Sequence, residues 1–123
     1  MMEKKRILVV DDEQNSREGL TKILIKEGYD VVAAESGETA LAEAKKQEFD
    51  LVITDLRMPE ISGIDVLEKI RENKPDIGVI IVTAYGEVNS YLKAMTLGAF
   101  EYLNKPIKLD ELRRVISKAL NKS

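Results

Sequence analysis

The fold of this protein is decided by the stretch Ile7-Leu8-Val9-Val10-Asp11-Asp12-Glu13, in which four aliphatic residues run directly into three carboxylates. An apolar run without alternation is typical of a strand that is covered on both faces, as in a parallel sheet. The same pattern recurs in Leu51-Val52-Ile53, which runs into Thr54-Asp55, and in Val79-Ile80-Ile81-Val82, which runs into Thr83. Two weaker runs cover residues 31–34 and 100–103. The sequence therefore predicts five strands.

The intervals between these runs have the spacing of helices, with apolar residues three and four positions apart. Ser36 is the expected N-cap of the second helix, and Gly28 and Gly98 are the expected stops of the first and fourth. Five repeats of strand and helix predict a three-layer, doubly wound α/β fold. We expect a flavodoxin-like (βα)5 arrangement with a five-stranded parallel sheet in the order 2-1-3-4-5. Ligands of such sheets bind at the carboxyl ends of the first and third strands, which are neighbours.

Length and composition predict a single domain over residues 1–123, with a folded core over about residues 6–120. The chain has no cysteine and no histidine, which excludes thiolate and imidazole chemistry. A net charge of −3 gives no field that would hold a polyanion, so we expect no direct nucleic-acid binding by this segment. The longest apolar runs have four residues, too short to span a membrane. We expect a cytoplasmic protein.

Carboxylates follow the first and third predicted strands. Asp12 and Asp55, with Asp11 close by, are expected to converge at one edge of the sheet, because adjacent strands lie about 4.8 Å apart. Three carboxylates oppose one another's ionisation unless a cation lies between them. Oxygen ligands without Cys or His suit Mg²⁺, with Mn²⁺ as the alternative. The sequence therefore predicts a divalent cation site.

A hydroxyl and an amine are expected at the same edge, because Thr83 ends the fourth predicted strand and Lys105 follows the fifth. Taken alone, each polar group has an ordinary explanation: an acidic turn or helix cap, a strand threonine, a surface lysine before a proline. Their coincidence at four strand ends favours a pocket for a phosphoryl group. Asp55 lies at the centre and is the candidate acceptor.

At these residues the chain resembles the receiver domains of two-component response regulators. The resemblance runs from Arg6 to Leu120 and is carried by the first stretch quoted above, by Asp55-Leu56-Arg57-Met58-Pro59 with Gly63, by Thr83-Ala84 and by Lys105-Pro106. It implies that Asp55 takes a phosphoryl group from a phosphohistidine on a sensor histidine kinase. It further implies that Asp12 and Asp55 bind Mg²⁺ directly, that Asp11 binds it through water, and that the backbone carbonyl of Arg57 is a third protein ligand.

The resemblance also implies a switch. Thr83 would hydrogen-bond one phosphoryl oxygen and Lys105 would pair with another. Movement of Thr83 would open space for Tyr102, which couples the site to the face made by the fourth helix, the fifth strand and the fifth helix. Arg57 and Tyr85 flank the site and are expected to tune dephosphorylation. In this family the Lys105-Pro106 peptide bond is expected to be cis far more often than other X-Pro bonds.

Residues 83–86 and 94–103 look most like receivers of the nitrogen-regulatory class, which control sigma-54-dependent transcription activators. The chain is then expected to be the N-terminal part of a longer regulator. Its partners would be a sensor histidine kinase, an output domain or downstream protein, and a second copy bound through the helix 4, strand 5 and helix 5 face.

Three alternatives stay open at this point. The chain could be a stand-alone receiver or phosphorelay intermediate. It could be a magnesium-dependent aspartyl phosphohydrolase of the haloacid dehalogenase type, although those enzymes use an Asp-x-Asp pattern after strand 1, whereas Asp11 and Asp12 are adjacent. It could be a flavodoxin-like nucleotide module, although it has no Gly-rich phosphate loop after strand 1. As a receiver it would turn over no separate substrate.

Overall fold

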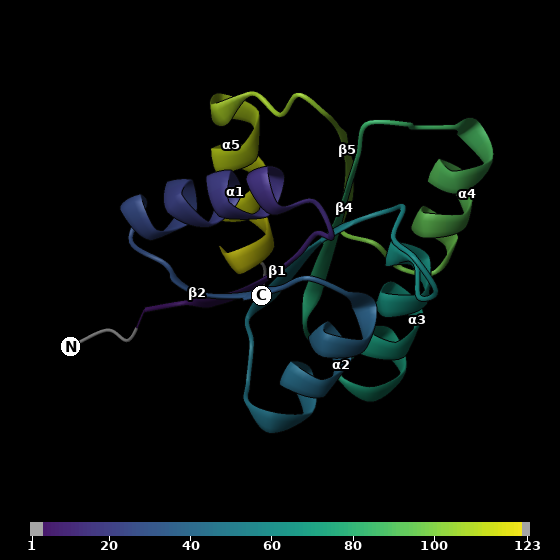
Figure 1. Cartoon of the computed structure of the whole chain (residues 1–123), viewed down its shortest axis with the longest axis horizontal. Helices are drawn as coiled ribbons and strands as arrows, with labels where there is room; N and C mark the ends of the chain where they lie inside the picture. Colours follow the sequence, from purple (N-terminus) through teal and green to yellow (C-terminus); the bar gives the residue numbers. More distant parts are fainter. Residues whose placement is uncertain (1–3, 122–123) are drawn as a thin grey trace.

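The structure is a computed structural model that describes residues 4–121. Its strands are β1 (Arg6–Val10), β2 (Asp30–Ala34), β3 (Leu51–Asp55), β4 (Gly78–Thr83) and β5 (Glu101–Asn104). Its helices are α1 (Gln14–Lys26), α2 (Gly37–Lys46), α3 (Gly63–Asn73), α4 (Val88–Thr96) and α5 (Leu109–Asn121). The sheet is parallel throughout and has the order β2-β1-β3-β4-β5, which confirms the predicted topology (Figure 1).

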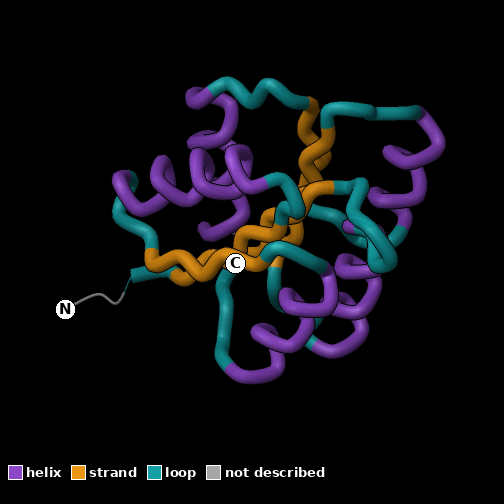
Figure 2. The backbone as a smooth tube through the Cα atoms, viewed as in Figure 1, coloured by secondary structure: helices purple, strands orange, loops and turns teal. Residues whose placement is uncertain are grey.

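Helices cover both faces of this sheet. In Figures 1 and 2, α1 and α5 lie on one side of the strands, while α2, α3 and α4 lie on the other. Side chains of each central strand alternate between the two cores: Leu8 and Val10 pack with α2 and α3, whereas Ile7 and Val9 pack with α1 and α5. Because both faces of these strands are buried, their sequences are unbroken apolar runs. Each fully buried aliphatic side chain stabilises the fold by about 1.5 to 3 kcal/mol.

The two edge strands explain why their sequence patterns were weaker. β2 has only one buried residue, Ala34, and β5 has four residues. The fifth strand begins one residue later than the predicted run, at Glu101 instead of Phe100, and extends to Asn104. The helix signals are confirmed, because Ser36 caps α2 and Gly28 has a φ of 100° just after α1.

The register of the sheet brings the carboxyl ends of β1, β3 and β4 to one level. Val10 is opposite Thr54, and Asp55 is opposite Val82. Asp11, one residue beyond β1, therefore lies beside Asp55 at the last residue of β3. This edge of the sheet is where the polar groups of the sequence gather.

Gly63 allows α3 to begin directly against the end of β3. Its amide donates a hydrogen bond to the carbonyl of Leu56 at 2.8 Å. A Cβ atom at this position would lie 2.1 Å from the carbonyl oxygen of Asp55 and 2.9 Å from the Cα of Leu56. Because both neighbours are backbone atoms, no side-chain rotation can relieve such a contact. The absence of a side chain at Gly63 thus permits the start of α3 to lie against the backbone of Asp55 and Leu56.

We expect Gly63→Ala to lower the free energy of unfolding by about 1 to 3 kcal/mol, as overpacking of this kind does. Urea unfolding monitored by circular dichroism measures this loss. Gly19→Ala in the middle of α1 is the matched control, because a Cβ there meets nothing within 4 Å. It should gain roughly 0.5 to 1 kcal/mol from helix propensity. Equal effects of the two substitutions would contradict the steric explanation.

Candidate functional site

Three carboxylates gather at the carboxyl end of the sheet. One carboxylate oxygen from each of Asp11, Asp12 and Asp55 lies within 4.8 Å of the other two. Asp11 is buried, Asp55 is partly buried and Asp12 is exposed. The structure therefore brings together the three acidic residues that the sequence singled out. Such a set of oxygen donors fits a hard divalent cation with several water ligands.

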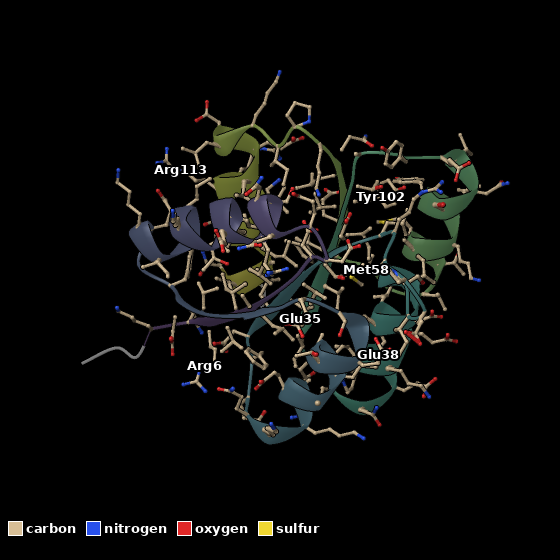
Figure 3. The ribbon with its side chains drawn as sticks, viewed as in Figure 1. Arg6, Glu35, Glu38, Met58, Tyr102 and Arg113 are labelled. Atoms are coloured by element: carbon tan, nitrogen blue, oxygen red, sulfur yellow. The ribbon has the colours of Figure 1, made fainter. Side chains whose placement is uncertain are left out.

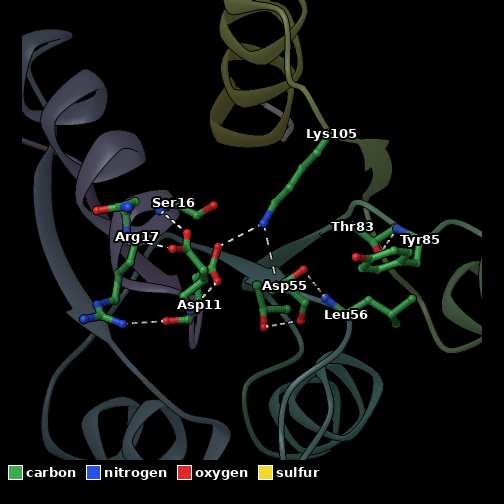
Figure 4. Close-up of polar contacts among 11 residues, drawn as sticks. Asp11, Ser16, Arg17, Asp55, Leu56, Thr83, Tyr85 and Lys105 are labelled. Atoms are coloured by element: carbon green, nitrogen blue, oxygen red, sulfur yellow. Dashed lines mark hydrogen bonds and ion pairs between the residues drawn. The ribbon is translucent and has the colours of Figure 1, made fainter.

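Asp11 is fixed by hydrogen bonds at each of its polar groups. Its amide donates to the carbonyl of Ala34 at 3.1 Å, and its own carbonyl accepts from Arg17 Nη1 at 2.9 Å. Its carboxylate accepts from the Glu13 amide at 2.9 Å and from Lys105 Nζ at 3.1 Å (Figure 4). The side chain is consequently held in one orientation, with its charge directed at the site.

Lys105 places its ammonium between the two least exposed carboxylates. Lys105 Nζ lies 3.1 Å from Asp11 Oδ2 and 3.8 Å from Asp55 Oδ2 (Figure 4). The residue follows β5, and its amide donates to the carbonyl of Thr83 at 2.8 Å. Its peptide bond to Pro106 is cis, a question that the sequence left open. One cation thus faces three anions, which leaves the site with a negative charge.

The pKa of Asp55 reflects this imbalance. Its surroundings together raise the pKa of the Asp55 carboxyl from its ordinary value of 3.8 to about 6: burial is the largest cause, and the charges of Asp11 and Asp12 act in the same direction. The Lys105 ammonium and a 3.0 Å hydrogen bond from the Leu56 amide act in the opposite direction. A divalent cation would favour the ionised form in the same way as Lys105 does.

Thr83 ends β4 beside these residues, and its side chain is buried. Its hydroxyl accepts a hydrogen bond from the amide of Tyr85 at 3.0 Å. The next residue, Ala84, lines a cavity of about 490 Å³ together with Asp55 and Lys105. A small side chain at this position leaves the carboxylate open to the cavity.

The remaining predicted residues lie farther along the same elements. Arg57 follows Asp55 by two residues, and its guanidinium pairs with Glu87 at 2.7 Å. Tyr102 is 9% exposed and lies on the side of β5 that faces α4 (Figure 3). Its ring meets that of Tyr91 edge to face, with centroids 5.5 Å apart. Tyr102 is thus removed from the carboxylates but buried between the sheet and α4.

Two further residues shape the site. The run Asp11-Asp12-Glu13 had a helix cap among its ordinary explanations, and its last residue, Glu13, does cap α1 by accepting from the amides of Ser16 at 2.7 Å and Asn15 at 3.3 Å. Arg17 was not singled out, although it holds the Asp11 carbonyl. An acidic residue just before a helix signals the cap. No sequence pattern indicates the Arg17 contact, which depends on how α1 returns across β1.

The chain belongs to the response-regulator receiver family, because the model of the response regulator receiver domain matches residues 7–117. It is 43% identical over 114 residues to the transcriptional regulatory protein ZraR of Escherichia coli, covering 93% of this chain and 26% of that protein. It is 37% identical to sporulation initiation phosphotransferase F of Bacillus subtilis, covering 97% of this chain and 96% of that protein. The chain thus spans about a quarter of the length of the curated transcription regulator.

Solved structures agree with this assignment. The response regulator TrrA of Thermotoga maritima, in complex with Mg²⁺ and BeF, has a TM-score of 0.86 and 46% identity, covering 94% of this chain and 99% of that one. The beryllofluoride-activated NtrC4 receiver domain dimer has a TM-score of 0.88 and 36% identity, covering 94% and 95%. The predicted likeness to the nitrogen-regulatory class is therefore confirmed. Within residues 4–121, no helix is both long and apolar enough to cross a membrane.

Asp55→Asn should raise stability in the absence of divalent cations. Because the pKa of Asp55 in the folded state lies above its ordinary value of 3.8, ionisation opposes folding, and the cost grows as the pH rises from 3.8 to about 6. After a discount for solvent screening, we expect a gain of about 1 to 2 kcal/mol above pH 7. Urea unfolding in chelator between pH 4.5 and 8 measures it. Asp76→Asn, at an exposed position, is the control, and a gain that is independent of pH would contradict the explanation.

Proposed function

We propose that Asp55 accepts a phosphoryl group from a phosphohistidine of a sensor histidine kinase, and that this modification switches an output. The observation that carries the proposal is the position of the Lys105 ammonium between Asp11 and Asp55, next to the third carboxylate of Asp12. Residues 1–123 would act as one receiver domain with its folded core over about residues 6–120. We further propose that the domain acts in the cytoplasm and binds no nucleic acid directly.

The donor set supports a Mg²⁺ site, with Mn²⁺ as an alternative. Asp12 and Asp55 would be direct ligands, Asp11 a ligand through water, and the backbone carbonyl of Arg57 the third protein ligand. When bound, the cation supplies charge neutralisation for the incoming phosphoryl group. The relative TrrA was solved with Mg²⁺ and BeF, which supports this choice of cation.

The transfer itself needs little from the protein beyond position and charge. An ionised oxygen of Asp55 forms a bond to phosphorus while the bond from phosphorus to the donor imidazole nitrogen breaks, and the imidazole keeps that electron pair. Lys105 Nζ, which lies 3.8 Å from Asp55 Oδ2, would form an ion pair with a phosphoryl oxygen. Thr83 would turn its hydroxyl from the Tyr85 amide to a phosphoryl oxygen. Water later hydrolyses the acyl phosphate, so no separate substrate is turned over.

The output side of the proposal rests on Tyr102 and α4. A shift of Thr83 would change the space beside Tyr102, which packs on Tyr91 of α4. The face made by α4, β5 and α5 would then bind an output domain, a downstream protein or a second copy. Control of transcription is supported by the likeness to ZraR, a transcriptional regulatory protein.

A phosphorelay intermediate is the second candidate function. It is favoured by one observation: sporulation initiation phosphotransferase F matches this chain over 96% of its own length. Such a protein would pass its phosphoryl group onward and would need no attached output domain. The two candidates share the chemistry at Asp55 and differ in what the switched face binds.

Incubation with Mg²⁺ and acetyl phosphate should add one phosphoryl group to the wild-type chain, measured by intact mass. Asp55→Asn should abolish this addition because the acceptor oxygen is lost. Asp76→Asn, an exposed carboxylate elsewhere on the chain, should be labelled like the wild type. Removal of Mg²⁺ with a chelator should also prevent labelling. Labelling of the Asp55→Asn variant at another residue would overturn the assignment.

Mg²⁺ with beryllofluoride should shift the chain from monomer to dimer, measured by sedimentation. The apolar side chains Val88, Tyr91 and Leu92 of α4 are 74%, 44% and 55% exposed and would be covered in the dimer. Val88→Asp should prevent the shift because it would bury a charge. The matched control is Ile25→Asp on α1, whose native side chain is 56% exposed on the other face. Unchanged monomers in beryllofluoride would argue for the phosphorelay candidate.

A further inference from the structure

Arg57 connects the loop that follows Asp55 to the loop that follows Thr83. Its guanidinium donates to Glu87 Oε1 at 2.7 Å. The same guanidinium lies over the ring of Tyr85, 5.6 Å from its centroid. These contacts join the β3–α3 loop to Tyr85 and Glu87 of the β4–α4 connection. Arg57 thereby links the loops that follow β3 and β4, the strands that end in Asp55 and Thr83.

Glu87 is the N-cap residue of α4 but does not act as its cap. Its backbone is extended, with φ −132° and ψ 151°, yet its side chain makes no capping hydrogen bond. Glu13 occupies the same position before α1, and its carboxylate caps the amides of Asn15 and Ser16. A glutamate in this chain can therefore reach the first turn of the helix that it precedes. The Glu87 carboxylate is instead engaged by Arg57.

The helix that Glu87 precedes is held weakly. Ala94 is the single buried residue of α4 within the described chain, and it lies in the second half of the helix. An open surface groove of about 580 Å³ lies between α4 and the start of α3, with Ser90 and Lys93 on its α4 side. The first turn of α4 is thus positioned by polar contacts more than by packing. Arg57 supplies the ion pair at that end.

We propose that the Arg57–Glu87 ion pair is a latch in which Glu87 has two mutually exclusive partners. In the unmodified protein Glu87 pairs with Arg57. When negative charge is added at Asp55, Arg57 turns toward it, and Glu87 is released to cap the amides of Asn89 and Ser90. Arg57 is a positioning residue in this scheme, and the trigger rests on the proposed phosphorylation of Asp55.

Charge and exposure support the exchange. Phosphorylation replaces the single charge of the Asp55 carboxylate by about −1.5 to −2 on the phosphoryl group, so the local charge becomes more negative by up to about one unit, and it adds three acceptor oxygens, which arginine binds well. Arg57 follows Asp55 by two residues, so its side chain starts from the same loop as the new charge. The existing pair is 56% and 62% exposed at its two side chains, and exposed ion pairs are weak. A weak pair can be broken by a competing charge, whereas a buried pair could not.

Amide hydrogen exchange at Asn89 and Ser90, followed by NMR without Mg²⁺ or phosphoryl donor, tests the latch directly. Arg57→Ala should slow exchange of both amides about threefold to tenfold, because Glu87 is freed to cap them. Arg57→Ala combined with Glu87→Ala should lose this protection. Arg57→Lys should behave like the wild type, since the ammonium can still pair with Glu87. Lys69→Ala, which removes the Lys69–Glu72 pair of α3, is the matched control.

Addition of Mg²⁺ and beryllofluoride gives the second arm. The wild type should gain the same protection at Asn89 and Ser90 as Arg57→Ala shows without additions, and Asp55→Asn should gain none. Unchanged exchange in Arg57→Ala would overturn the latch. If acetyl phosphate labels Asp55 but the two amides do not respond, the latch is wrong and the proposed function stands. If Asp55 is not labelled, the proposed function fails, and the first arm still decides whether Arg57 restrains Glu87.

Discussion

The whole site depends on one ammonium that is shared between two carboxylates. Lys105 follows the last strand of the sheet, Asp11 follows the first and Asp55 ends the third, so their contact requires the parallel pairing of β1, β3, β4 and β5. The ammonium compensates part of the acidic charge, but burial and the neighbouring carboxylates still raise the pKa of Asp55 to about 6. The uncompensated charge is what makes a divalent cation fit the site.

The placement of the Asp55 carboxylate depends on small residues, which let neighbouring backbone segments lie close to it. Gly63 brings the start of α3 against the Asp55 carbonyl, and Ala84 leaves the carboxylate open to the neighbouring cavity. The hydrogen bonds around Asp11 then fix the second carboxylate. The backbone therefore sets the positions of the Asp11 and Asp55 carboxylates, while the net charge of the site can still change when a cation or a phosphoryl group binds. A phosphoryl-transfer site requires this combination, because its chemistry is mostly alignment and neutralisation.

Much of this could be predicted from the sequence, since unbroken apolar runs identify buried parallel strands and their polar ends meet at one edge. Asp11, Asp12, Asp55 and Lys105 were brought together as expected. The Arg17 contact and the engagement of Glu87 by Arg57 could not be predicted. Both depend on loop paths and helix orientation, which side-chain periodicity does not encode. The fifth strand was also displaced by one residue, because an edge strand is hydrogen-bonded to a neighbour on one side only.

The fold separates a rigid part from a part that can move. Both faces of the central strands are fully buried, so the sheet cannot readily adjust to a new charge. The buried position of Tyr102 is less stable than that of the central strands. Within residues 4–121 its hydroxyl is one of two buried polar side-chain atoms without a hydrogen-bond partner. An unmade bond of this kind costs about 1 to 3 kcal/mol, which offsets much of what burial of the ring and its contact with Tyr91 contribute. Because α4 is also held by few buried atoms, added charge at Asp55 would be relieved on the side of α4 and β5 before it disturbed α1 or α5.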